Sequence, residues 1–414
     1  MGKVNIANLR EGMVLADNLV DTTGRCLLTQ GSVVQMRHIH IMKSWGITEA
    51  DVEGVDQEQA ASSAMAEIDP ELIKKCEDYI APFFNRSNQE HEVMQEIKRQ
   101  SVLRLARKWP GNSGLFENSA DSDSTGASDG PPDEKTVPVQ KLVDSSQLAS
   151  FPDIYYRIDK ALRDPKSSAA HLAETISSDT SLAAKLLRLA NSAFYGLPSK
   201  TDSITRAVTL IGTKEISTLA LGVLAIRYFK NIPQKLINMK GFWTHSVACG
   251  FFASILAQRK IGLSEERFFI AGLLHDIGRL VMSMGLPKNM AYAVSQSRTT
   301  STPLNEVERE VFGFDHTKTA SLLMKKWEIP MTLENMLRYH HDPVKSPNPL
   351  EASVIHVADI MAIAFQFGHS GEMMVPSLKA EVWNTLGISR SVIEPTLTQV
   401  ERLVNDTMKD FLYE

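Results

Sequence analysis

The stretch Phe268-Phe269-Ile270-Ala271-Gly272-Leu273-Leu274-His275-Asp276-Ile277-Gly278, residues 268–278, decides how the C-terminal half of the chain is interpreted. Its apolar run predicts a buried helix. The run ends in an imidazole and a carboxylate, side chains that are costly to bury without a partner. Because adjacent helical residues point about 100° apart, His275 would bind one metal ion while Asp276 bridges two. The stretch therefore predicts a buried polar site inside a helical domain.

More histidines and aspartates surround this stretch along the chain. Together they form an ordered series of imidazoles and carboxylates: His245, His275, Asp276, His316, His340, His341 and Asp359. Such ligands suit borderline and hard divalent cations, such as Fe, Mn, Ni, Zn or Mg. Two such ions about 3.5–4 Å apart clamp a phosphate and activate a bridging water. We therefore predict a site for two divalent metal ions, of a kind suited to phosphate ester hydrolysis.

The first and last members of the series lie on apolar helical faces. His245 belongs to a predicted helix over 242–258, where an isolated histidine is more often a hydrogen-bonded core residue than a ligand. Asp359 lies in an apolar helix, where a cation would offset the cost of burying its carboxylate. The alternative is that Asp359 bonds His275 or Arg279 in a polar network without metal.

The other members lie at predicted helix ends. Asp315 is expected to cap a helix whose first turn contains His316, and His340-His341 end a helix before Asp342-Pro343.

Length and composition limit the class of protein. The 414 residues allow two or three domains, and a hydrophobic content of 43% with 22% charged residues is ordinary for a globular protein. No apolar stretch is long enough for a membrane span or a secretory signal, so we expect a cytosolic protein. A net charge of -5 makes nucleic acid an improbable partner. The three cysteines, Cys26, Cys76 and Cys249, are expected to be reduced thiols.

Four segments follow one another along the chain. We predict a small mixed α/β domain over 1–57, a helical segment over 66–109, a flexible linker over 110–139 and an all-α domain over 140–414. The helical segment has a face suited to packing on a partner, and its basic run from Lys98 to Lys108 is expected to face solvent. The linker has too few apolar residues to offset the entropy of ordering.

Turn and cap residues predict individual elements. In the first domain, a Gly-containing turn at 21–24 predicts a hairpin, followed by a helix over 36–45 and a strand over 47–55. In the all-α domain, Asp179 or Thr180 can cap a helix that is broken near Gly196, and Ser203 can cap a second helix ending at Gly212. A third helix is predicted over 214–228. These helices either present a surface to a partner or, as is more common, simply pack in the core.

The series of ligands resembles that of the HD superfamily of metal-dependent phosphohydrolases, with Leu274-His275-Asp276-Ile277-Gly278 as its centre. Further motifs are similar to those of the HDOD branch and cover about 143–413. They are Asn191-Ser192-Ala193-Phe194-Tyr195-Gly196, Ile204, Ala207, Leu210, Gly212, Trp243-x-His245-Ser246 and Trp327-x-x-Pro330. Residues 9–15 and 45–47 resemble the leading domain of some HD-GYP signalling proteins.

The chain departs from the HD-GYP pattern in three places. Residues 342–347, Asp-Pro-Val-Lys-Ser-Pro, stand where a Gly-Tyr-Pro segment is expected after the double histidine. Arg279 replaces a lysine, and Gly241 stands where members with a third metal have a glutamate. The resemblance therefore implies a two-ion site without the pocket for cyclic di-GMP.

Two functions follow from the resemblance. The first is a bacterial signal-transduction protein, in which the HDOD region is a scaffold or output module that acts on protein partners. The second is a phosphohydrolase for a nucleotide or cyclic dinucleotide, with Asp276 bridging two ions and Arg279 or Lys318 offsetting phosphate charge.

Overall fold

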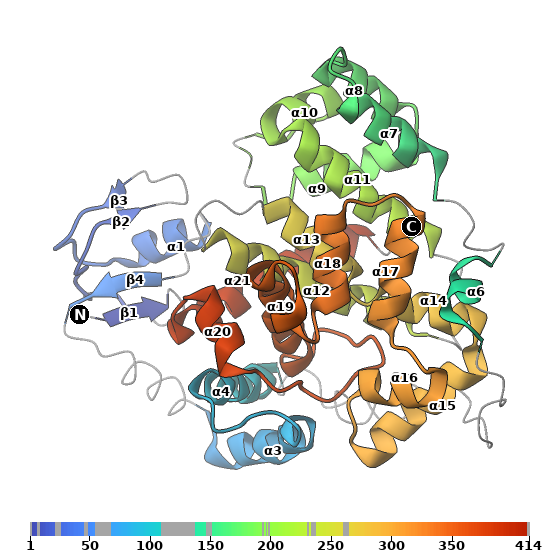
Figure 1. The fold of residues 1–414 in the computed structure, drawn as a ribbon. Coiled ribbons are helices and arrows are strands. Elements are labelled where there is room, and N and C mark those ends of the chain that lie inside the picture. Colours follow the sequence, from blue (N-terminus) through green and yellow to red (C-terminus); the bar gives the residue numbers. More distant parts are fainter. Residues whose placement is uncertain are drawn as a thin grey trace.

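The computed structural model describes residues 2–5, 9–20, 26–44, 49–53, 68–108, 137–145, 151–192, 194–195, 197, 199–229, 232, 237–259 and 265–411. Most of the predicted linker, the hairpin turn at 21–25, the motif residues 45–47 and Gly196 lie outside the described residues. Helices dominate the described part of the chain (Figure 1), which confirms the predicted fold class.

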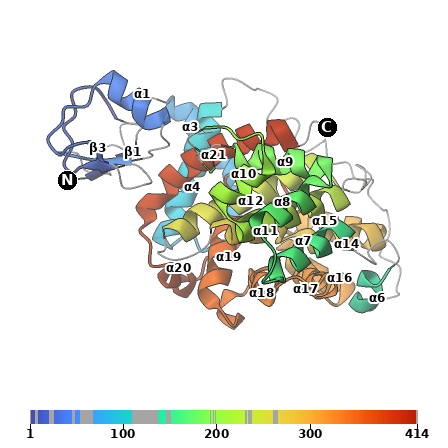
Figure 2. The same ribbon diagram turned by 90° about the horizontal axis from the view of Figure 1, so that it is seen from above.

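The N-terminal domain is a small mixed α/β unit with its own core. Its elements are β1 (Gly2–Asn5), β2 (Leu19–Val20), β3 (Cys26–Leu28), α1 (Met36–Ser44) and β4 (Glu49–Val52). Antiparallel pairing of β2 with β3 confirms the hairpin, and β4 returns to pair antiparallel with β1. Val4, Leu15, Val34, Ile39, Met42 and Val52 form a separate apolar cluster. Figure 2 shows this domain at one edge of the molecule.

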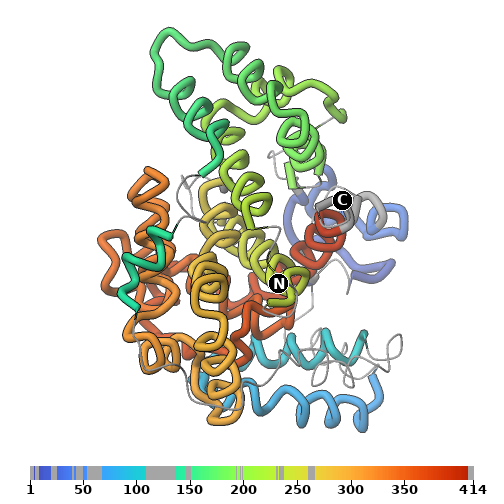
Figure 3. The backbone as a smooth tube through the Cα atoms, turned by 90° about the vertical axis from the view of Figure 1, so that its right-hand side faces the viewer, coloured from blue at the N-terminus to red at the C-terminus, as the bar shows by residue number. Residues whose placement is uncertain are grey.

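The helical segment that follows packs on the C-terminal domain. It comprises α3 (Pro70–Ile80), the 3-10 turn η1 (Ala81–Phe84) and α4 (Glu92–Lys108), and Figure 3 shows α3 and α4 along one side of the helical body. Ile97 and Val102 belong to the main core cluster. In the basic run, Arg104 pairs with Glu401 at 2.7 Å and Lys108 pairs with the same carboxylate at 3.1 Å. Part of this run therefore serves internal packing rather than facing solvent.

A bundle of short helices forms the first part of the C-terminal domain. It contains α7 (Asp153–Arg163), α8 (Ala169–Ser177), α9 (Thr180–Ala190), α10 (Ile204–Ile211) and α11 (Thr213–Tyr228), after the short α6 (Val139–Val143). Asp179 and Ser203 cap α9 and α10 as predicted. Gly212, with φ of 114°, ends α10, and α11 then leaves at 118° to it. Only glycine adopts this backbone readily.

Helix α9 ends at Ala190, earlier than predicted. The Asn191 carboxamide accepts from the Thr201 N–H and donates to the Thr201 carbonyl, both at 2.7 Å, so this side chain ties the helix end to the following loop. Phe194 is half-buried, with its ring 5.5 Å from Phe251 and 5.7 Å from Phe269. This part of the motif therefore packs in the core.

Longer helices form the body that contains the ligand series. They are α12 (Met239–Gln258), α13 (Glu265–Leu274), α14 (Ile277–Gly285), α15 (Pro287–Thr300), α16 (Leu304–Phe312), α17 (His316–Lys326), α18 (Met331–Tyr339), η5 (Pro343–Lys345), α19 (Pro349–Ala364), α20 (Ala380–Leu386), η6 (Arg390–Val392) and α21 (Ile393–Phe411). Helix α12 packs against α13, α19 and α21, and α14 packs against α17.

Among the described residues, the stretch Glu266–Gly285 and the bent pair α10 and α11 are long and apolar enough to cross a membrane by length and composition alone. In Glu266–Gly285, 89% of the most apolar 18 residues are buried inside the fold, as in a core segment. The cytosolic location stays a prediction.

Candidate metal centre

Five segments bring the predicted ligands together. His245 comes from α12, His316 from the first turn of α17, and Asp359 from the middle of α19. His340 and His341 were expected to end a helix, and they directly follow α18, which ends at Tyr339. His275 and Asp276 lie in a turn between α13 and α14, not within one helix as expected, and this turn points both side chains into the same interior space.

A glycine permits the close packing behind this turn. A Cβ on Gly278 would lie 2.0 Å from the carbonyl oxygen of His316 and 3.0 Å from the backbone nitrogen of Ala320. Helices α14 and α17 therefore approach each other closely only because position 278 has no side chain. This contact brings His316 beside Asp276.

The first group of donor atoms surrounds Asp359. Its Oδ1 atom lies 3.2 Å from His245 Nε2 and 3.3 Å from His275 Nε2. His275 Nε2 is also 3.3 Å from Asp276 Oδ2, and the two imidazole Nε2 atoms are 3.3 Å apart. Two imidazoles and two carboxylates thus face one small volume.

The second group consists of His316, His340 and His341, whose ligating atoms all lie within 4.8 Å of one another. The Nε2 atoms of His316 and His341 are 3.1 Å apart. His316 Nε2 lies 3.1 Å from Asp276 Oδ1, whereas Asp276 Oδ2 faces the first group. The two oxygens of Asp276 therefore face different groups, as a bridging carboxylate requires.

The outer nitrogens of His275 and His340 already have backbone partners, whereas Nδ1 of His245 has none. His275 Nδ1 donates to the Gly272 carbonyl at 2.6 Å, and His340 Nδ1 donates to the Leu337 carbonyl at 2.8 Å. This arrangement fixes the tautomer and leaves Nε2 as the ligating atom.

Three ligating atoms inside the centre have no hydrogen bond of good geometry: His340 Nε2, Asp276 Oδ1 and Asp359 Oδ1. Imidazole nitrogens lie 3.1–3.3 Å from the two carboxylate oxygens without such a bond. An unpaired buried polar atom costs about 1–3 kcal/mol, and a coordinated cation would remove that cost. The donor set and the unpaired atoms therefore fit divalent metal ions.

The electrostatics of the protein alone show strong coupling between these groups. Burial by itself would raise the pKa of Asp276, but the Arg279 guanidinium and the imidazoles of His275 and His316 hold it well below the usual range. Burial and Arg279 oppose the charged form of His316, but Glu308 and Asp276 outweigh them and raise its pKa to about 9. Burial and the neighbouring imidazoles lower the pKa of His340 to about 3.

Two residues that the sequence analysis missed support the centre. Glu308 accepts from His316 Nδ1 at 2.6 Å, from the His316 backbone N–H at 2.9 Å and from Arg279 Nε at 2.9 Å. Ser370 contacts Asp276 Oδ2 and accepts from Arg279 Nη1 at 2.7 Å. Glu308 stands four residues from both Leu304 and Phe312, and an acidic residue at helical spacing among apolar ones was a usable signal, whereas nothing local distinguishes Ser370.

The predicted phosphate-binding side chains lie in different environments. Arg279 is buried and pairs with Asp276 at 2.7 Å and with Glu308 at 2.9 Å, not with Asp359. Lys318 is exposed on α17. Their role toward a phosphate stays a prediction, and the buried ion pairs favour a positioning role for Arg279.

One cysteine lies beside the first group. The Cys249 sulfur and the ligating atoms of His275 and Asp359 are within 4.8 Å of one another. The sequence placed Cys249 one turn after His245 but did not identify it as a neighbour of the site. All three cysteines are free thiols, as predicted.

The fold and the site define a class of protein: one with a helical domain that encloses a centre of histidine and aspartate side chains. Residues 148–343 match the family model of the HDOD domain, so the protein contains an HDOD domain. That match includes six members of the series and ends before Asp359. The likeness of residues 9–15 and 45–47 to an HD-GYP leading domain stays a prediction.

One curated relative and several solved structures are similar to the chain. An uncharacterized protein of Treponema pallidum (strain Nichols) is 25% identical over 233 residues, which are 55% of this chain and 44% of that protein. The match thus spans less than half of the relative's length.

The solved structures share the fold at low sequence identity. An HDOD domain protein from Geobacter sulfurreducens has a TM-score of 0.54 and 22% identity, covering 64% of this chain and 93% of that one. A proposed phosphohydrolase from Shewanella amazonensis SB2B has a TM-score of 0.53 and 22% identity, covering 66% of this chain and 97% of that one. A proposed signal transduction protein from Marinobacter aquaeolei VT8 has a TM-score of 0.52 and 21% identity, covering 72% of this chain and 65% of that one.

Proposed function

We propose that this protein is a regulatory protein of bacterial signal transduction, whose HDOD domain holds a dinuclear metal centre and acts as a scaffold or output module on protein partners. The observation that carries the proposal is the convergence of seven imidazole and carboxylate ligands from five segments, with Asp276 between two groups. His245, His275, Asp359 and Asp276 would hold one ion. His316, His340, His341 and Asp276 would hold the other.

The number of protein ligands supports a regulatory rather than a catalytic centre. The assignment above gives each ion four protein ligands, and four of the imidazoles have 0% of their surface exposed. Structural metal sites have all four positions filled by protein, whereas catalytic sites keep one position for water or substrate. A closed centre of this kind stabilises one arrangement of the surrounding helices.

The contacts around the centre also provide a route for a signal. Ser370, which touches Asp276, lies in the segment that follows α19. Five residues later, the Val375 N–H donates to the Phe83 carbonyl of η1 at 2.8 Å. A change at the metal centre would therefore reach the α3–α4 segment, which lies outside the HDOD family match.

The second candidate function is a metal-dependent phosphohydrolase acting on a nucleotide or cyclic dinucleotide. The two-sided contacts of Asp276 favour it, because a carboxylate shared by two ions is typical of such enzymes. His341 is half-buried and marks the side from which a substrate would approach. Bound metal would supply the nucleophilic hydroxide, and this chain's residues would orient it and offset phosphate charge.

Metal content and activity separate the two functions. We expect the native purified protein to contain two divalent ions per chain by elemental analysis, and to leave bis-p-nitrophenyl phosphate and cyclic di-GMP unhydrolysed. Turnover that is lost in Asp276→Asn while two ions stay bound in the wild type would establish the phosphohydrolase. A protein that takes up no ion on titration with Mn²⁺ or Zn²⁺ would contradict both.

Controls must separate ligand loss from unfolding. His171 is exposed on α8, so His171→Ala should bind metal like the wild type, whereas His275→Ala should lose metal. Circular dichroism must show that both variants remain folded. The regulatory function further predicts that metal slows amide hydrogen exchange in η1 and α4, and unchanged exchange there would contradict the proposed route.

A further inference from the structure

A small cavity lies beside the metal centre, and of its lining residues only Ser370 takes part in the function proposed above. It has a volume of about 40 Å³ and is enclosed by α14, α15, the start of α12 and the loop 369–371. Its lining residues include Asn238, Ser283, Arg298, His369 and Ser370. We call it the Ser283 cavity.

The Ser283 cavity has buried polar residues among apolar ones, the latter being Ile237, Met290, Ala291 and Val294. Ser283 is 1% exposed, and its hydroxyl has no hydrogen-bond partner. A buried hydroxyl without a partner costs about 1–3 kcal/mol, so a ligand that bonds it would be favoured. Ser370, 4% exposed, is a second buried polar residue of the lining. Asn238 is exposed and Arg298 half-buried, so both lie nearer solvent.

The charge of the lining favours an anion. Arg298 contributes a guanidinium, Asn238 a carboxamide and Ser283 a hydroxyl, and no carboxylate is among the residues lining the cavity. A guanidinium forms its strongest hydrogen bonds with phosphate or carboxylate oxygens. Asn238 also caps α12, whose N-terminal end carries a partial positive charge.

The size of the cavity limits the ligand. Since one water needs about 10–15 Å³ of such volume, the space of about 40 Å³ admits about three water-sized groups. A single oxyanion with a few oxygens fits, and a nucleotide does not.

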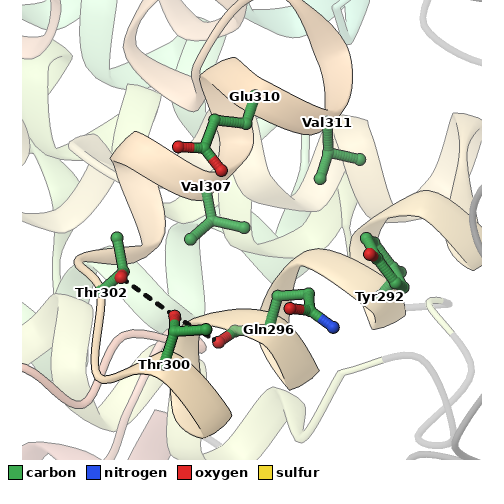
Figure 4. A pocket seen from close by; sticks show the side chains of 7 residues that line it. All are labelled: Tyr292, Gln296, Thr300, Thr302, Val307, Glu310 and Val311. Atoms are coloured by element: carbon green, nitrogen blue, oxygen red, sulfur yellow. Dashed lines mark hydrogen bonds between the residues drawn. The ribbon is translucent and has the colours of Figure 1, made fainter.

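A second pocket nearby provides a contrast. It lies between α15 and α16 and is lined by Tyr292, Gln296, Thr300, Thr302, Val307, Glu310 and Val311 (Figure 4). Its volume is about 360 Å³, and the only charged group among its lining residues is the Glu310 carboxylate. Two pockets that share α15 thus differ in the sign of their charge, and only the Ser283 cavity suits an anion.

We propose that the Ser283 cavity is a binding site for a free oxyanion of the inorganic phosphate class, held by Arg298, Ser283 and Asn238. Through Ser370 the site adjoins the metal centre, because the same hydroxyl contacts Asp276 and Arg279. Bound oxyanion and bound metal would therefore influence each other's affinity, and the influence must be reciprocal. The site itself does not depend on metal.

The test is calorimetric titration of the full-length protein, freed of metal with a chelator, with inorganic phosphate at constant ionic strength. We expect saturable binding of one phosphate per chain. Affinity should fall about tenfold in Arg298→Gln, through loss of a charged hydrogen bond, and about fivefold in Ser283→Ala. Gln296→Ala, on the same helix but lining the other pocket, should bind phosphate like the wild type.

Several outcomes would overturn the proposal. One is the absence of saturable binding up to about 10 mM phosphate. Another is equal affinity in Ser283→Ala and the wild type, since this small substitution is expected to fold even if Arg298→Gln does not. Tighter binding of a nucleoside monophosphate than of phosphate would also exclude a free oxyanion as the ligand. Because metal is removed beforehand, these results are independent of whether the metal centre proves functional.

Discussion

Replacing Glu308 by glutamine tests whether the residues behind the ligands set the affinity for metal. The carboxylate is completely buried and accepts three hydrogen bonds, two from His316 and one from Arg279. Glutamine has nearly the same shape as glutamate but only one accepting oxygen. The amide nitrogen of the glutamine must then face another donor, either the His316 ring or the Arg279 guanidinium, and the hydrogen bond at that position is lost.

The cost follows from these contacts. A hydrogen bond to a charged group contributes about 1.5–3 kcal/mol, and removing one partner of a buried ion pair costs about 3–5 kcal/mol. Arg279 keeps Asp276 as a second partner, so we expect Glu308→Gln to lower the free energy of unfolding by about 3 kcal/mol. Loss of the group that orients His316 should weaken metal binding about 10- to 100-fold.

Competition with a fluorescent chelator measures the metal affinity, and urea denaturation measures stability. The matched control is Glu310→Gln, which removes an exposed carboxylate from the same helix and should change neither quantity. A folded Glu308→Gln protein that binds Mn²⁺ or Zn²⁺ as tightly as the wild type would show that this residue does not position His316 for metal.

Three further predictions follow. The raised pKa of His316, about 9, means that a metal ion must displace the proton of this imidazole. The affinity for metal should therefore rise as pH increases toward 9, by about tenfold per pH unit for each proton displaced. A metal affinity that does not change between pH 6.5 and 8.5 would contradict this. Asn191→Ala removes both hydrogen bonds to Thr201 and should lower the free energy of unfolding in urea by about 2 kcal/mol, whereas an unchanged midpoint would mean that the loop is held otherwise. Gly278→Ala places a methyl group 2.0 Å from the His316 carbonyl oxygen. It should lower the free energy of unfolding, measured by thermal denaturation, by about 3 kcal/mol, and it should also weaken metal binding. Wild-type stability and affinity would show that α14 and α17 separate freely.

Local signals in the sequence predicted much of the fold. Ser203 and Asp315 were identified as caps from side-chain type and position alone, and Asp179 was one of two candidates for a third. Each accepts from a backbone N–H in the first turn of its helix. A cap acts within a few residues, so neighbouring sequence is sufficient to recognise it. The hairpin formed by β2 and β3 follows from turn chemistry in the same way.

The helix breaks were less predictable. The helix expected to continue toward Gly196 stops at Ala190, because the Asn191 side chain bonds Thr201, ten residues further on. His275 and Asp276 were expected within a helix but lie in a two-residue turn between α13 and α14. The contact that ends α9 joins residues ten apart, which periodicity does not report.

The sequence by itself determined which imidazoles and carboxylates were available to the centre, because the kind of ligand that a residue offers depends only on its side chain. Tertiary packing decided that Asp276 faces both groups, that Glu308 and Ser370 support it, and that Arg279 pairs with Asp276 rather than Asp359. It also placed the α3–α4 segment on the C-terminal domain. These contacts join residues far apart along the chain, and their geometry is set by how whole helices pack against one another.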